Sequence, residues 1–197
     1  MLFDDRAAAE KIVATEHGVN RLDAVYDDFV IVGPASDPAA IRGFTDAGKA
    51  LAQIAAKGAA FASRGDGSSA NQLELKLWKS AGVEPEKGLA WYNKAGQGME
   101  PTLALAATKS AYTLTDRFSW ANFKNRQSLE ILAEGDPALF NPYGSILVNP
   151  ARWPHVKFAD ARTWHEWLTS NAGLDAITSY RISGEQLFFP PRLDATH

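Results

Sequence analysis

One turn of this chain collects groups that could hold an anion. It follows a short apolar run, 60–62, and residues 63–69 read SRGDGSS. The arginine offers a fork of N–H donors, and the two glycines let the backbone approach a ligand closely. Ser69 to Gln72 has capping-box spacing, so a helix is expected to start here and to present its N–H groups to negative charge. The pattern predicts a metal-free oxyanion site. Its candidate contacts are Arg64, Ser63, Ser68 and Ser69.

Other turns carry weaker signals. Gly98 precedes a second expected helix and could offer that helix start to an anion, although Glu100 places a carboxylate there. Thr113, in an expected strand, is a candidate hydroxyl contact, whereas Asp116 and Arg117 fit a structural ion pair. The alternative for the turn at 63–69 is an ordinary surface turn in which a serine only caps a helix.

Catalytic and metal-binding patterns do not occur in the sequence. The spacing of the four histidines is not that of metal ligands: His17, His155, His165 and His197. No serine lies in a Gly-x-Ser-x-Gly turn, and Asp27 and Asp28 would project to opposite faces of a strand. These observations predict a binding protein and not an enzyme, with no cofactor and no metal.

Six tryptophans leave a sugar-stacking platform open as a weaker alternative. Trp164 and Trp167 are three residues apart, and this spacing is more typical of one apolar helix face packed into a core.

Composition narrows the class of protein further. The chain has 197 residues, 46% of them hydrophobic, and a net charge of -3. Its 20 basic residues are scattered, so the sequence lacks the footprint of a nucleic-acid binder. Cysteine is absent, no run of about 18 apolar residues occurs, and residues 1–6 do not begin a signal peptide. An acidic globular protein of this kind must hold any anion by local contacts.

Short apolar strands alternate with amphipathic helices, which predicts α/β layers. The expected strands are 26–32, 111–114, 129–132 and 143–148, and the expected helices include 6–16, 45–56, a segment ending near 109, and a helical region at 159–180. The segment between the first and last of these strands has its own alternation. We therefore expect two lobes, the first formed by 1–33 and 143–197 and the second by 34–142.

Several ordered stretches over nearly the whole chain carry a family resemblance. They are 26–38, 61–68, 91–92 with 96–99, 111–117, 134–144 and 186–190. Together they resemble the substrate-binding proteins of tungstate ABC transporters, the TupA type, in the type II periplasmic binding-protein superfamily. The resemblance implies an α/β, two-lobe fold that captures tungstate, or molybdate, in an interlobe cleft for a membrane permease. It also implies a periplasmic location, and Arg64, with Ser63 and Ser68 beside it, matches the family's main charged contact.

Three departures from the family pattern stand beside this resemblance. Family members begin with a further portion that includes an anion-binding turn, so the first lobe is expected to be incomplete at its N-terminus. The turn reads Ser68-Ser69-Ala70 where Ser-Gly-Thr is usual, and Glu100-Pro101 replaces small residues. The alternative function is therefore a truncated or diverged domain with weak or no oxyanion affinity, acting as a sensor or interaction module. An exposed sheet edge would also favour a homodimer.

Overall fold

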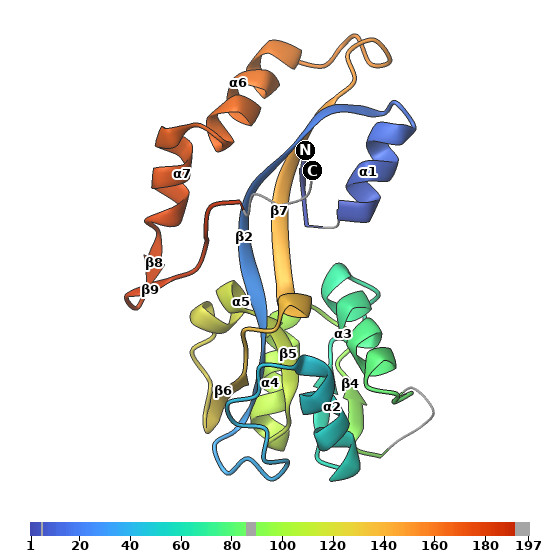
Figure 1. Cartoon of the computed structure of the whole chain (residues 1–197), viewed down its shortest axis with the longest axis vertical. Coiled ribbons are helices and arrows are strands. Elements are labelled where there is room, and N and C mark those ends of the chain that lie inside the picture. Colours follow the sequence, from blue (N-terminus) through green and yellow to red (C-terminus); the bar gives the residue numbers. More distant parts are fainter. Residues whose placement is uncertain (5, 86–89, 192–197) are drawn as a thin grey trace. The chain divides into compact units, whose positions relative to one another are not determined.

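The computed structural model describes residues 1–4, 6–85 and 90–191 of the chain. It divides into two compact units, which are treated separately. Unit 1 consists of residues 1–27 and 141–197, and unit 2 of residues 28–140. Strand β2 (Gly18–Pro34) contributes to both, because the division falls within it. Helices and strands are labelled in Figure 1.

Unit 2 is a mixed sheet covered by helices (Figure 1). Its elements are α2 (Ala47–Ala56), β3 (Phe61–Ser63), α3 (Ser69–Ser80), β4 (Tyr92–Lys94), α4 (Met99–Lys109), β5 (Thr113–Asp116), α5 (Arg117–Asn122), β6 (Leu129–Ala133) and a 3-10 turn, Pro137–Leu139. The end of β2 pairs antiparallel with both β5 and β6. Strands β3 and β4 pair in parallel, and a parallel bridge joins Phe61 to Tyr112 just before β5. This order confirms the predicted α/β class.

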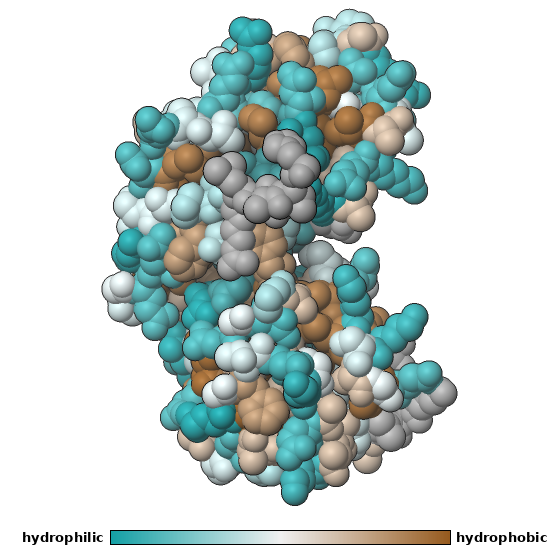
Figure 2. Space-filling view, viewed as in Figure 1, coloured by the Kyte–Doolittle hydropathy of each residue, from teal (hydrophilic) through white to brown (hydrophobic). Residues whose placement is uncertain are grey.

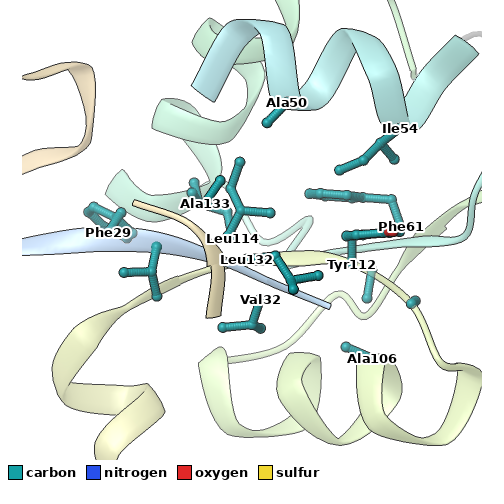
Figure 3. Packing of buried hydrophobic residues seen from close by; sticks show 14 of the residues in the cluster. Phe29, Val32, Ala50, Ile54, Phe61, Ala106, Tyr112, Leu114, Leu132 and Ala133 are labelled. Atoms are coloured by element: carbon teal, nitrogen blue, oxygen red, sulfur yellow. The ribbon is translucent and has the colours of Figure 1, made fainter. Parts of the chain in front are cut away.

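The core of unit 2 lies between this sheet and its helices. Figure 3 shows Phe61 and Tyr112 packed beneath Ile54 of α2, with Ala106 of α4 on the other side. All four of these residues have 0% exposure. Burial of large side chains at about 25 cal/mol per Å² of apolar surface explains why short strands such as β3 stay in place. The anion-site candidates are therefore carried on a packed scaffold.

Unit 1 combines the start of β2 with later elements. These are β1 (Leu2–Phe3), α1 (Arg6–Ala14), β7 (Phe140–Val148), α6 (Phe158–Leu168), α7 (Asn171–Thr178), β8 (Arg181–Ile182) and β9 (Glu185–Gln186). Strand β7 lies between β1 and β2 in the sheet. The helical region expected at 159–180 contains two helices, because Ser170 caps a new start by accepting from the Gly173 N–H.

Two surface features bear on the sequence predictions. Trp164 and Trp167 share a helix face and stack with ring centroids 5.0 Å apart, but Trp164 is 52% exposed, so this face is not packed fully into a core.

In the view of Figure 2, hydrophilic residues cover most of the surface, with smaller hydrophobic areas between them. Among the helices that the structure describes, none has the length and apolar character needed to cross a membrane.

Candidate functional site

The candidate site lies at one edge of the unit 2 sheet. Strands β3, β4 and β5 run in the same direction, so their carboxyl ends, at Ser63, Lys94 and Asp116, meet the same edge. A helix follows each strand: α3, α4 and α5. Ligands of open α/β sheets bind beyond the carboxyl ends of strands, where helix N-termini point their N–H groups outward. The turn at 63–69 leads from β3 into α3 and therefore lies at this edge.

Arg64 is held in this turn by Asp66. Its Nε donates to Asp66 Oδ2 at 2.7 Å, and its side chain keeps 25% exposure. The two terminal guanidinium nitrogens have no hydrogen-bond acceptor within the described residues. Gly65 has φ +63°, and a Cβ there would lie 3.0 Å from the Lys94 Cβ, so glycine is needed for both the conformation and the contact. Asp66 thus fixes the guanidinium through Nε and leaves its two terminal nitrogens available to a ligand.

Asp66 also organises the start of α3. Its Oδ1 accepts from the Ser68 hydroxyl at 2.6 Å and from the Ser68 N–H at 3.1 Å. Burial opposes ionisation of this carboxyl, but the hydrogen bonds from Ser68 and the charge of Arg64 outweigh it and lower the pKa of Asp66 to about 2. Ser68 is the N-cap of α3 and accepts from the Asn71 N–H. Asp66 is therefore a carboxylate at neutral pH.

The start of α4 has no comparable side-chain cap. Its N-cap is Gly98, and a Cβ at that position would meet nothing within 4 Å. The N–H groups of Met99 and Glu100 have no acceptor within the described part of the chain, and Pro101 has no N–H to satisfy. The Thr102 N–H returns to the Gly98 carbonyl. Two donors of this helix start are thus available to a ligand.

The start of α5 offers fewer groups to an anion than the start of α4. Asp116 caps it by accepting from the Ser119 N–H at 2.7 Å. The expected pair of Asp116 with Arg117 does not form; Arg117 instead donates to Asp28 at 2.6 Å and to Glu134 at 2.6 Å. The hydrogen bonds that Arg117 donates to Asp28 lead the interactions that raise the pKa of Arg117 above its usual range. This arginine is committed to structure.

Comparisons with known proteins show the family of this chain. Residues 1–172 match the family described as "PBP superfamily domain". A tungstate-binding protein TupA from Peptoclostridium acidaminophilum is 37% identical over 96% of this chain and 67% of its own length. The chain belongs to the TupA family of the PBP superfamily. A solved tungstate-binding TupA from Desulfovibrio alaskensis G20 is 42% identical, with a TM-score of 0.84 over 96% of this chain and 77% of that one.

A third relative, from Haloferax volcanii, is named provisionally as an ABC transporter anion-binding protein. It is 43% identical over 98% of this chain, which spans only 57% of its length. The TupA relatives and the solved structure confirm the predicted family and the type II fold class.

The structure brings together some of the predicted contacts of this TupA-family chain and not others. Arg64, Ser68, Ser69 and Gly98 lie at the carboxyl edge of the sheet. The side chain of Ser63 faces inward: the residue has 0% exposure and its hydroxyl donates to Glu74 at 2.9 Å. Thr113 is the first residue of β5, at the opposite end of that strand from Asp116, and has 1% exposure.

Sequence reasoning missed three residues at this edge. Glu74 and Tyr92 contact each other and Ser63 in the interior, and Lys94 ends β4 beside Gly65. The signal for Lys94 was present, since a basic residue just before a glycine turn at a strand end repeats the pattern of Arg64. No group of three metal-ligating side chains occurs in the described residues, and His197 lies outside them.

Proposed function

We propose that this chain binds tungstate at the carboxyl edge of unit 2 and serves as the solute receptor of an ABC transporter. The observation that carries the proposal is the open end of the Arg64 guanidinium, in a turn that leads into α3 and whose Arg64 carbonyl accepts from the Gly96 N–H just before α4. A charged donor and unsatisfied N–H groups form charge-assisted hydrogen bonds of about 1.5 to 3 kcal/mol each with an oxyanion. The names of the TupA relatives support tungstate as the ligand.

The donor-only character of the open groups supports a fully deprotonated tetrahedral anion. Tungstate and molybdate share charge and shape at neutral pH, so we extend the proposal to molybdate. Phosphate and sulfate differ from them in protonation and in size, respectively, and are expected to bind less well. We expect no enzymatic activity, since the relatives are named for binding and not for a reaction.

The contacts assigned to the anion are Arg64, Ser69 at the start of α3, and the start of α4 at Gly98. Ser68 is left out because its N–H and its hydroxyl both donate to Asp66. Ser63 and Thr113 are left out of this set because their side chains are buried. We further propose a membrane permease as the partner and the periplasm as the location, as for ABC receptors of this superfamily. Homodimerisation through a sheet edge stays a prediction, and gel filtration would measure it.

One observation favours the second candidate function, a domain with weakened affinity. The hydroxyl protons of Ser63 and Ser68 are both donated to carboxyl groups, and Glu100 adds a negative charge in the first turn of α4. If two charge-assisted bonds are missing, affinity falls by about two to four decades. Such a domain would bind tungstate only weakly and would act as a sensor or interaction module.

Calorimetric titration separates the two functions. The chain would be titrated with tungstate, molybdate, sulfate and phosphate, alongside Arg64→Ala and a matched Arg42→Ala variant. Arg42 pairs with Glu130 on an exposed part of unit 2, so its loss should leave affinity unchanged. Tungstate should bind most tightly, and Arg64→Ala should weaken it by about a hundredfold or more. Equal affinity of the two variants would reject this site.

A further inference from the structure

Directly behind the Arg64 turn lies a buried carboxyl group that the proposed site does not use. Glu74 is on the inner face of α3 with 2% exposure. An ionised carboxylate in such a place is costly unless donors or a cation surround it. No basic side chain forms an ion pair with it among the described residues. What surrounds it instead is a set of hydrogen-bonding groups from β3, β4 and its own helix.

Three of these side chains, with four oxygens between them, form a closed triangle of hydrogen bonds. The Ser63 hydroxyl lies 2.9 Å from Glu74 Oε2. The Tyr92 hydroxyl lies 2.8 Å from Ser63 Oγ and 2.7 Å from Glu74 Oε1. All three distances are those of O–H···O hydrogen bonds, and each such bond requires its own proton.

Counting protons decides the state of the carboxyl. Ser63 and Tyr92 bring one hydroxyl proton each, which satisfies two of the three contacts. The third proton must come from Glu74. This holds for both directions in which the hydrogen bonds can run around the ring. If Glu74 were ionised, one pair of oxygens would face each other with lone pairs only. The triangle is therefore complete when Glu74 is neutral.

Two further groups donate hydrogen bonds to the carboxyl. Trp78 Nε1 donates to Glu74 Oε1 at 3.2 Å, and the backbone N–H of Arg64 also bonds to the carboxyl. These hydrogen bonds favour the ionised form, but burial outweighs them and raises the pKa of Glu74.

Several charged side chains on neighbouring elements are paired with other groups. The Arg64 guanidinium pairs with Asp66. On α2, Lys49 pairs with Asp46, which caps that helix, and on β5 Asp116 caps α5. Tyr92 is the titratable side chain in direct contact with Glu74. Glu74 is the carboxyl group of this cluster, and burial raises its pKa.

We propose that Glu74 is a positioning residue for oxyanion binding, and that the site takes up a proton at Glu74 together with the anion. This inference rests on the proposed function. The protonated ring joins β3, β4 and α3, and so holds the Arg64 turn in its binding geometry. An ionised Glu74 would open the ring and place a negative charge behind the turn that must receive a dianion. Oxyanion affinity should therefore fall as the pH rises through the titration of Glu74.

The test is the pH dependence of tungstate affinity, measured by calorimetry from about pH 6 to about pH 9, where no ordinary carboxyl group titrates. In the wild-type chain the affinity should fall toward the upper end by up to about tenfold per pH unit, the limit for one linked proton. Glu74→Gln should bind tungstate with a flatter profile, because its amide supplies the third proton of the ring without titrating. Glu130→Gln, at an exposed carboxylate that pairs with Arg42 outside the proposed site, should keep the wild-type slope.

Two further readouts separate proton uptake from a structural effect. Titrations in two buffers of different ionisation enthalpy should show net proton uptake in the wild type that is absent in Glu74→Gln. Above the pH at which Glu74 ionises in the free protein, an infrared difference spectrum of the wild type on addition of tungstate should gain the carbonyl band of a protonated carboxyl group. This measurement does not require the variant to fold.

The outcomes distinguish the two proposals. If tungstate does not bind at any pH, the proposed function fails. If it binds with the same affinity throughout the range, or if Glu74→Gln keeps the full slope and the full proton uptake, the role of Glu74 is rejected and the site at Arg64 stands. A pH dependence of tungstate affinity that is present in the wild type and absent in Glu74→Gln would support both the proposed function and the role of Glu74.

Discussion

The starts of α3 and α4 lie at the same edge of one sheet but are capped in different ways. The start of α3 is held by its own side chains: Ser68 caps it, Asp66 binds Ser68, and Glu74 anchors the preceding strand. The start of α4 has a glycine cap and a proline in its first turn, with no side-chain cap. The start of α3 is held in place and carries the permanent charge of Arg64, whereas the start of α4 offers backbone N–H donors. An oxyanion site needs both, since fixed charge gives orientation and open N–H groups give hydrogen bonds.

The largest effect is expected from removing the buried carboxyl group that supports the start of α3. Glu74→Ala leaves the Ser63 hydroxyl, the Tyr92 hydroxyl and the Trp78 N–H without their buried acceptor. Unsatisfied buried groups cost about 1 to 3 kcal/mol each, so the free energy of unfolding should fall by about 3 kcal/mol or more. Urea unfolding at neutral pH measures this loss.

The isosteric variant Glu74→Gln serves as the control for that measurement, because it retains a donor and an acceptor. It should lose much less than Glu74→Ala. Equal losses in the two variants would mean that packing volume, and not the hydrogen-bonded ring, supports β3.

The open start of α4 is tested by closing it. Gly98→Asp introduces a side chain into empty space, where its carboxylate can cap the helix and repel an anion. Tungstate affinity should fall by about tenfold, while the melting temperature stays unchanged or rises.

Gly98→Asn is the matched variant, since asparagine has similar size and capping ability without the charge. It should retain most of the affinity. If both variants weaken binding equally, the cause is steric, and the idea of an electrostatically open helix start is wrong.

The two caps can also be compared directly through stability. Ser68→Ala removes a side chain that accepts from the Asn71 N–H, so it should lower the free energy of unfolding by about 1 kcal/mol. Gly98→Ala removes no such bond and should cost less than Ser68→Ala. Chemical denaturation of both variants beside the wild type measures the difference. A larger loss for the glycine variant would reverse the contrast between the two helix starts.

The sequence predicts the edge of the site better than its interior. The turn at 63–69, the helix that follows it and the glycine start near Gly98 depend on local residue order, and local order is what propensity and capping rules read. The interior contacts depend on tertiary structure. Ser63 meets Glu74 and Tyr92, and Tyr92 lies 29 residues away along the chain, so a serine expected as an anion donor is instead a buried partner of a carboxyl group.

The same limit explains the misassigned partner of Arg117. Its neighbour Asp116 is adjacent in sequence, whereas its actual partner Asp28 is 89 residues away and comes alongside only because β2 and β5 pair. Asp116 is itself occupied as the N-cap of α5, where it accepts from the Ser119 N–H. Sequence order alone carries no record of such pairings.

The smallest effect should come from Glu100, which lies in the first turn of α4. In the free protein its carboxylate interacts favourably with the positive end of the helix, by about 0.3 to 1 kcal/mol at low salt. Once an oxyanion occupies the same end, that carboxylate becomes a like charge next to the ligand. Glu100→Gln should therefore lower stability slightly and raise tungstate affinity by about threefold, as measured by calorimetry. The gain should shrink toward about 1 M salt, where the screening length is about 3 Å. A loss of affinity in the variant would show that Glu100 supports the open helix start even when the anion is bound.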